Sequence, residues 1–239
     1  ALQAALTPRT KALLVNSPSN PHGHVFTRAE FETIVEFVTA NDLWLISDEI
    51  YERITFDGRQ HQSFAADPRV ADRTILVNGF SKTYAMTGWR LGYLAAPPPV
   101  VDLALRLQSQ AVTSASTVAM AAGVAALSGP QDCVAEMVAA YDDRRRFFVG
   151  ALRDIGLPCP DVEGAFYVFT PIPRDWPGGS DAFARELLDD AGVATVPGGA
   201  FGPAGEGHVR ATLATSMADL ERAAERIRAF VHQRVGSAA

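Results

Sequence analysis

The chain has 239 residues, of which 48% are hydrophobic and 20% are charged, and its formal net charge at pH 7 is −6. This length allows one large domain or two small ones. The negative charge and the lack of a basic stripe argue against nucleic-acid binding, and no apolar run is long enough to cross a membrane. Cys133 and Cys159 show neither metal-type nor disulfide-type spacing, which fits a reducing cytoplasm.

The first part of the chain alternates short apolar runs with helical patterns. Residues 11–16 are predicted to form a buried parallel strand, and the turn-rich segment 17–23 follows it. Thr27 and Glu30 have the spacing of a capping box, which predicts a helix over 28–40. Further apolar runs predict buried strands over 43–47, 74–78 and 91–95.

Prolines 97–99 end the last of these strands and predict a helix that runs to about residue 110. A small-residue helix is expected over 116–127 and, after Gly129-Pro130, a long helix over 131–155. From Gly164 the pattern changes to that of an α+β unit. Its expected elements are a strand over 165–170, a helix over 181–191, strands over 194–197 and 208–214, and a helix over 217–235.

These patterns predict two domains, an α/β layer over residues 1–129 and a smaller α+β domain with its linking helix over residues 130–239. Within the long helix, Arg144-Arg145-Arg146 follows Asp142-Asp143, and we interpret this run as a solvated helix face. None of the five scattered histidines pairs with an acidic residue at metal-ligand spacing, so no metal site is predicted.

Lys82 is one of only two lysines among 21 basic residues, and Lys11 is the other. Arginine stays protonated, whereas a desolvated lysine amine can lose its proton and form a Schiff base. Lys82 follows the strand predicted over 74–78, and α/β sheets bind their ligands at the carboxyl ends of strands. Lys82 is therefore the candidate catalytic residue.

Other polar residues follow or begin neighbouring strands and can meet at the same edge of the sheet. They supply an amide, a carboxylate, a phenol, a hydroxyl and a guanidinium, a suitable set for holding a phosphorylated pyridine aldehyde. The residues expected at this edge, besides Lys82, are Asn20, Asp48, Tyr51, Ser81 and Arg90.

Four motifs in this order resemble a known family. They are NPHG at 20–23, DEIY at 48–51, SKTYAMTGWRLGY at 81–93 and HVRATLA at 208–214. Together they resemble the class I/II (fold type I) pyridoxal-phosphate (PLP) aminotransferases, most closely the aspartate/aromatic branch, over essentially the whole chain. The resemblance implies PLP as cofactor. It also implies an α/β fold with a mostly parallel large-domain sheet and a C-terminal α+β small domain.

The resemblance implies a role for each residue of the cofactor site. Lys82 would form a Schiff base with PLP and later move a proton, and Asp48 would pair with the pyridine nitrogen. Asn20 and Tyr51 would hydrogen-bond the phenolic oxygen of the ring. The same residues also fit structural roles, with Asp48 as a helix N-cap, Asn20 in an Asn-Pro turn, Tyr51 in the core and Lys82 on the surface.

Two arginines are implied to bind anionic groups. Arg90 would clamp the cofactor phosphate with Ser81 as a helper, although some family members have a phosphate-binding serine where this chain has Gly79. Arg210, together with Asn20, would bind the α-carboxylate of the substrate. Arg90 also fits a surface ion pair, and Arg210 fits a structural arginine.

Family chains are considerably longer, and the resemblance places Ala1 inside the large domain. We therefore expect that the sequence lacks an N-terminal portion of the fold, as a fragment rather than a naturally short chain. A chain of this kind would expose a sheet edge and apolar faces. It is expected to bind PLP weakly and to transaminate poorly on its own.

The function predicted from these motifs is amino-group transfer between an L-amino acid and a 2-oxo acid, in a cytoplasmic protein that forms a homodimer when complete. No nucleic-acid or membrane partner is expected. Two alternatives stay open at this point. One is a PLP-dependent lyase of the same fold, such as a C–S β-lyase or a cyclopropane-forming synthase, and the other is a non-catalytic aminotransferase-like sensor domain.

Overall fold

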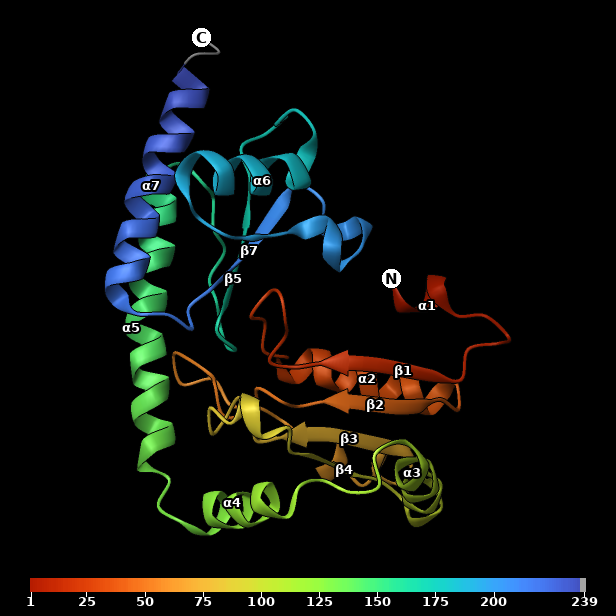
Figure 1. Ribbon diagram of the computed structural model, residues 1–239. Coiled ribbons are helices and arrows are strands. Elements are labelled where there is room, and N and C mark those ends of the chain that lie inside the picture. The colour runs from red at the N-terminus through yellow and green to blue at the C-terminus, as the bar shows by residue number, and fades with distance from the viewer. Residues whose placement is uncertain (237–239) are drawn as a thin grey trace. The chain divides into compact units, whose positions relative to one another are not determined.

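The hydrophobic patterns of the sequence fold into two units, each with its own sheet, in the computed structural model shown in Figure 1, which describes residues 1–236. Unit 1 comprises Ala1–Pro18 and Val25–Val134. Unit 2 comprises Ser19–His24 and the chain from Ala135 onward. The domain boundary predicted between residues 129 and 130 stays a prediction.

In unit 1, four strands form a mixed sheet with the order β1-β2-β3-β4. The strands β1 (Ala12–Asn16), β2 (Trp44–Asp48) and β3 (Thr74–Gly79) are parallel, and β4 (Gly92–Ala95) pairs antiparallel with β3. Parallel strands bring their carboxyl ends to one edge of a sheet. Because β4 runs the opposite way, its first residue lies at that same edge, which therefore collects four chain segments.

Helix α2 (Arg28–Ala40) supplies the core of unit 1. Its capping box is confirmed, since Thr27 accepts a hydrogen bond from the Glu30 N–H and the Glu30 side chain accepts one from Thr27. The apolar face of the helix packs against the sheet and the following loop, and the rings of Phe31 and Phe64 stack with centroids 4.3 Å apart. The buried cluster consists of Phe31, Ile34, Val35, Val38, Leu43, Leu45, Phe64 and Val70.

Other parts of unit 1 are exposed. β1 is an edge strand whose Leu14 is 64% exposed, and every residue of β4 is exposed, so the prediction of buried strands at these two places is wrong. The expected exposure of apolar faces is seen on the helices. The remaining helices are α1 (Leu2–Ala5), α3 (Pro98–Ala111), which has no buried residue, and α4 (Thr117–Ser128), which buries only Ala119 and Gly123. Their exposed apolar residues include Leu103, Leu107, Val118, Val124 and Leu127.

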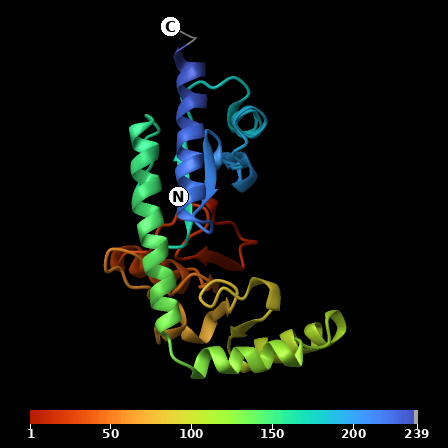
Figure 2. The same cartoon turned by 60° about the vertical axis from the view of Figure 1, so that its left-hand side comes forward.

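Unit 2 pairs a small antiparallel sheet with helices. Its strands are β5 (Tyr167–Pro171), β6 (Val196–Pro197) and β7 (His208–Thr212), in the order β5-β7-β6. The helices are α5 (Asp132–Asp154), α6 (Gly179–Ala191) and α7 (Met217–Gly236), and Figure 2 shows the green α5 beside the blue α7. Buried aromatic and aliphatic side chains of all three helices form the core, among them Phe148, Leu152, Phe183, Leu187 and Ile227.

The arginine run of α5 corrects one sequence interpretation. Arg145 is only 7% exposed, pairs with Asp142, and donates from Nη1 to the carbonyl oxygen of Val162 at 2.9 Å. Successive helical residues are about 100° apart around the axis, so three consecutive side chains cannot all face water on a packed helix. Arg146 is exposed as predicted, whereas the interpretation of a solvated face is wrong for Arg145.

The capping box generates a prediction for stability. Thr27→Ala removes the hydroxyl that accepts from the first turn of α2, and we expect a loss of about 1 kcal/mol in the free energy of unfolding. The control is Thr33→Ala on the exposed side of the same helix, where the change is expected to stay within about 0.5 kcal/mol. Urea unfolding of the purified chain measures both. Equal losses for the two variants would show that the cap does not stabilise α2.

Candidate functional site

The main chain at the carboxyl end of β2 is held from both sides. The carbonyl oxygen of Asp48 accepts a hydrogen bond from Asn16 Nδ2 at 3.0 Å, and the next N–H, of Glu49, donates to the carbonyl oxygen of Val77 at 2.9 Å. The Asp48 side chain turns back on its own backbone, where Oδ1 accepts from the N–H of Ile50 at 3.2 Å. The carboxylate therefore has a defined place at the edge of the sheet.

The surroundings of Asp48 raise the pKa of its carboxyl. Burial is the largest cause that raises the pKa of this carboxyl above its ordinary value, and the negative charge of Glu49 raises it further, while the hydrogen bond from Ile50 lowers it. A half-buried carboxyl with a raised pKa at a strand end is typical of a functional position.

Two more of the predicted residues meet above this edge. Lys82, in the loop that follows β3, places Nζ 5.8 Å from the centroid of the Tyr51 ring, within the range of a cation–π contact. Tyr51 is buried, whereas Lys82 and the neighbouring Ser81 are half-buried. The amine is thus held beside an aromatic face instead of extending into water.

The loop between β3 and β4 carries Lys82 and Arg90 together. Gly79 and Gly92 face each other where the loop closes, and a Cβ added to Gly79 would lie 3.0 Å from the Cα of Gly92. Arg90 is exposed at φ +53°, and its Nη1 donates to the carbonyl oxygen of Thr87 at 3.0 Å. One short loop, closed by two glycines, therefore supplies the amine and a guanidinium.

Asn20 and Arg210 are brought together within unit 2, 190 residues apart in the chain. Arg210 Nη1 donates to Asn20 Oδ1 at 2.9 Å. The guanidinium lies over two rings, 4.4 Å from the centroid of Tyr167 and 4.9 Å from that of Phe201. Flat stacking on aromatic rings suits a guanidinium better than an ammonium group, and it holds this arginine in one orientation.

Close packing explains why the last residue of the NPHG motif is a glycine. Gly23 adopts φ +69°, and an added Cβ would lie 2.7 Å from Val162 Cγ1 and 2.9 Å from the carbonyl oxygen of Gly164. The Gly23 carbonyl oxygen accepts from the N–H groups of Glu163 and Gly164. The turn that carries Asn20 is thus packed directly on the segment before β5, where only glycine fits.

Sequence reasoning missed two pairs of histidine and glutamate. His61 Nε2 lies 2.9 Å from Glu49 Oε2, and His24 Nδ1 lies 2.8 Å from Glu163 Oε2. Partners 12 and 139 residues apart leave no spacing signal. One sequence feature could have indicated the Glu49 pair. Glu49 comes two residues after Ser47 of the predicted buried strand, so its carboxylate is expected on the buried face, where it needs hydrogen-bond partners.

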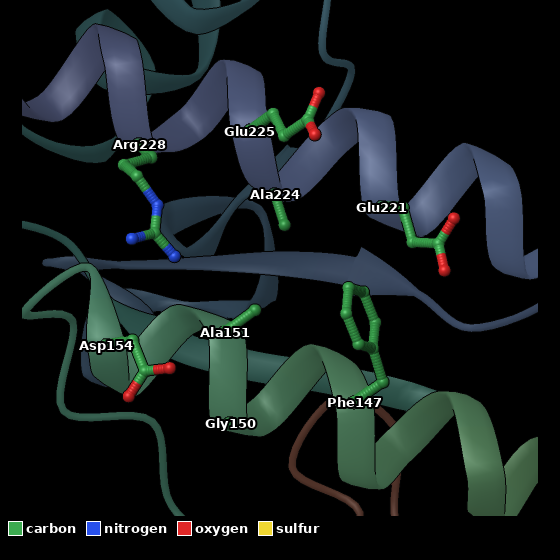
Figure 3. A pocket seen from close by; sticks show the side chains of 8 residues that line it. All are labelled: Phe147, Gly150, Ala151, Asp154, Glu221, Ala224, Glu225 and Arg228. Atoms are coloured by element: carbon green, nitrogen blue, oxygen red, sulfur yellow. The ribbon is translucent and has the colours of Figure 1, made fainter.

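A cavity of about 570 Å³ lies between α5 and α7, and none of the predicted site residues lines it. Figure 3 shows Phe147 of α5 and Arg228 of α7 projecting into it from facing helices. Its charged residues, among them Asp154 and Glu225, lie along its length without converging on one point. We interpret it as an open groove between two helices, because a binding site needs a few convergent polar groups.

The model of the family described as aminotransferase class I and II matches residues 1–227. The chain belongs to this family. Aminotransferases of classes I and II use PLP as their cofactor. The donor set in unit 1 fits that group chemically, since an amine can bind its aldehyde, a carboxylate its ring nitrogen, a phenol its ring oxygen and a guanidinium its phosphate.

Individual relatives are similar to nearly the whole chain. It is 41% identical to the aspartate aminotransferase of Pyrococcus abyssi, covering 98% of this chain and 60% of that protein. It is 42% identical to aromatic-amino-acid aminotransferase 2 of Thermococcus litoralis, covering 95% and 58%. The crystal structure of the aromatic aminotransferase from Pyrococcus horikoshii superposes with a TM-score of 0.94 at 43% identity, covering 98% and 63%.

The comparisons confirm the predicted fold class, because the solved relatives are PLP-dependent aminotransferases of fold type I. The chain spans about 60% of the length of the curated relatives that it matches. Within residues 1–236, no helix is both long and apolar enough to cross a bilayer.

The raised pKa of Asp48 predicts a pH-dependent stability difference. A raised pKa means that the folded chain binds the proton more tightly than the unfolded chain, so this carboxyl lowers stability as pH rises from the ordinary value of 3.8 through the folded value. Asp48→Asn keeps the acceptor for the Ile50 N–H but cannot ionise. We expect it to be more stable than the wild type at pH 7 and equally stable near pH 3.

Urea unfolding at both pH values measures this difference, and Asp102→Asn on the exposed side of α3 is the matched control. The control should follow the wild type at both pH values. Lower stability of Asp48→Asn at pH 7 would mean that ionised Asp48 stabilises the fold, contrary to the desolvation argument.

Proposed function

We propose that the complete protein is a PLP-dependent aminotransferase that moves an amino group between an L-amino acid and a 2-oxo acid, with Lys82 as the residue that carries the cofactor. The observation that supports this most directly is the meeting of Lys82 with Tyr51 at the strand edge that also holds Asp48, in a member of the aminotransferase class I and II family. PLP, when bound, supplies an electron sink for reactions at the α-carbon of an amino acid.

In this proposal the residues of unit 1 bind and orient the cofactor. Lys82 Nζ would hold the cofactor covalently and would move a proton, which suits an amine held against an aromatic face. Asp48 would pair with the ring nitrogen of the bound cofactor, and Tyr51 would hydrogen-bond its ring oxygen. Arg90 and Ser81 would bind the phosphate, for which a guanidinium supplies forked donors.

The residues of unit 2 recognise the amino acid in the same proposal. Arg210 binds the α-carboxylate with two parallel hydrogen bonds, because its guanidinium is already held over the rings of Tyr167 and Phe201. Asn20 holds Arg210 through Oδ1 and thereby contributes to recognition of the α-carboxylate in this proposal.

A homodimer and a cytoplasmic location belong to the same proposal. Exposed apolar side chains on α3 and α4 are available for an association in the complete protein. The free thiols of Cys133 and Cys159 fit a reducing compartment. The aminotransferase names of the relatives favour amino-group transfer over the lyase and sensor alternatives.

A labelling experiment tests the cofactor site. The purified chain is mixed with PLP, its visible spectrum is recorded, and borohydride reduction followed by peptide mass mapping locates the modified residue. We expect a visible absorption band and a label on Lys82, because its amine is the one held at the strand edge.

The two lysines of the chain provide matched variants, Lys82→Ala and Lys11→Ala. The band and the label are expected to disappear in the first and to persist in the second. The assignment of Lys82 would be refuted by a label spread over Lys11 and the N-terminal amine, together with the absence of a band that depends on Lys82.

If Arg210 binds the substrate carboxylate, Arg210→Gln should lower catalytic efficiency with an amino acid. In the complete protein we expect kcat/KM for an amino acid to fall about 10- to 100-fold, because a charge-assisted pair of hydrogen bonds is lost. Arg185→Gln, at an exposed position of α6, is the control and should behave like the wild type. Steady-state kinetics measure both variants, and equal kinetics would exclude Arg210 from substrate binding.

A further inference from the structure

Glu49 is a fully buried carboxylate, with 0% of its side chain exposed, and it lies directly after Asp48. Three side chains hydrogen-bond to it. Its Oε1 accepts from the hydroxyls of Ser47 and Ser63, each at 2.9 Å, and its Oε2 lies 2.9 Å from His61 Nε2. A buried carboxylate with this many partners is held in one conformation.

The hydrogen bonds of Glu49 and the Asp48 carboxylate lie on opposite faces of the strand. Successive residues of a β-strand point to opposite faces. Ser47 and Glu49 contact each other and so share one face, which leaves Asp48 between them on the other face. The main chain at Glu49 is also held in place, because its N–H donates a hydrogen bond to the carbonyl oxygen of Val77. Glu49 therefore holds the end of β2 from the face opposite to the Asp48 carboxylate.

The partners of Glu49 tie this strand end to the core. Ser63 immediately precedes Phe64, which is fully buried and stacked on Phe31 of α2. His61 is itself only 9% exposed. The loop that carries both residues is thus fastened at one end in the hydrophobic cluster and at the other to the carboxylate beside Asp48.

Stability alone is a poor reason to keep such a group. Burying a charged carboxylate costs free energy that its partners only offset, and well-packed apolar residues often stabilise a core equally well. Buried ionic groups have a better-attested use in specifying one arrangement of the chain. The arrangement specified here is that of the strand end carrying Asp48, whose carboxyl also senses the charge of Glu49.

We propose that Glu49, held by His61 and Ser63, is a positioning residue that fixes the Asp48 carboxylate at the edge of the sheet; this rests on the proposed function, in which Asp48 pairs with the pyridine nitrogen of PLP. Glu49 itself does not touch the cofactor in this proposal. It acts by keeping the last residues of β2 in register with β1 and β3.

The test uses three variants of the full chain. Glu49→Gln keeps the size of the side chain and removes its charge. Ser63→Ala removes one hydrogen-bond donor and leaves the charge of Glu49 in place, so it tests position apart from charge. Glu36→Gln makes the same chemical change at an exposed position of α2 and is the matched control.

The first readout needs no cofactor. The carboxyl carbon of Asp48 is followed by NMR as pH is changed, with its signal assigned from Asp48→Asn. We expect a lower pKa for Asp48 in Glu49→Gln, because a negative neighbour is lost and the carboxyl becomes more hydrated. A lower pKa is also expected in Ser63→Ala, through hydration alone, and no change is expected in Glu36→Gln.

The second readout is PLP binding, measured by titration of the visible band and its dependence on pH. Loss of the network is expected to weaken binding about three- to tenfold in Glu49→Gln and Ser63→Ala, the range of one hydrogen bond. The pH profile of the band should also shift, because the partner of the ring nitrogen is displaced. A purely structural role would lower thermal stability without moving either spectrum.

The proposal is overturned if Ser63→Ala has the wild-type titration of Asp48, whatever its thermal stability. If Glu49→Gln does not fold, Ser63→Ala decides by itself. If even the wild-type chain takes up no PLP, the proposed function loses its support for this chain, while the NMR titration still shows whether Glu49 and its partners position Asp48. Failure of the two proposals is thus distinguishable.

Discussion

The candidate site depends on how the main chain is held at the carboxyl end of β2. The carbonyl oxygen of Asp48 accepts a hydrogen bond from Asn16 at the end of β1, and the N–H of Glu49 donates to the carbonyl oxygen of Val77 of β3. These bonds leave the strand end no freedom to fray, although loops follow it. A side chain placed there projects from a backbone that is held in position, as a binding site requires.

The sheet topology brings several chain segments to the edge at which β2 ends. Three parallel strands end at the edge, and the antiparallel β4 begins there, so the loop from β3 to β4 leaves and returns to the same place. Gly79 and Gly92 allow its two ends to approach closely. Lys82 and Arg90 consequently come from one closed loop, and their relative placement depends on few freely rotating backbone bonds.

In both units, polar site residues lie in surroundings that do not stabilise the fold in an obvious way. Burial opposes ionisation of Asp48, and the fully buried Glu49 needs three partners. The Arg210 guanidinium lies over two aromatic rings and donates a hydrogen bond to the side-chain oxygen of Asn20. Such arrangements are typical of sites in which function, and not stability, selected the residues.

Much of the fold and most of the candidate site could be predicted because their signals are local. The capping box at Thr27, the periodicity of α2 and the glycine and proline turns depend on neighbouring residues, and the observed α2 has the predicted bounds of Arg28–Ala40. The motifs that carry Asp48 and Lys82 are likewise short runs. Local interactions act through sequence spacing, so the sequence alone determined these features.

Only the tertiary structure decided which distant groups meet and which faces are covered. It paired Glu49 with His61, joined Asn20 to Arg210, turned Arg145 inward and left Leu14 exposed at a sheet edge. Each of these outcomes depends on the packing of segments that are far apart in the chain. No spacing pattern encodes such contacts, because burial and hydrogen bonding between distant residues are set by the whole fold.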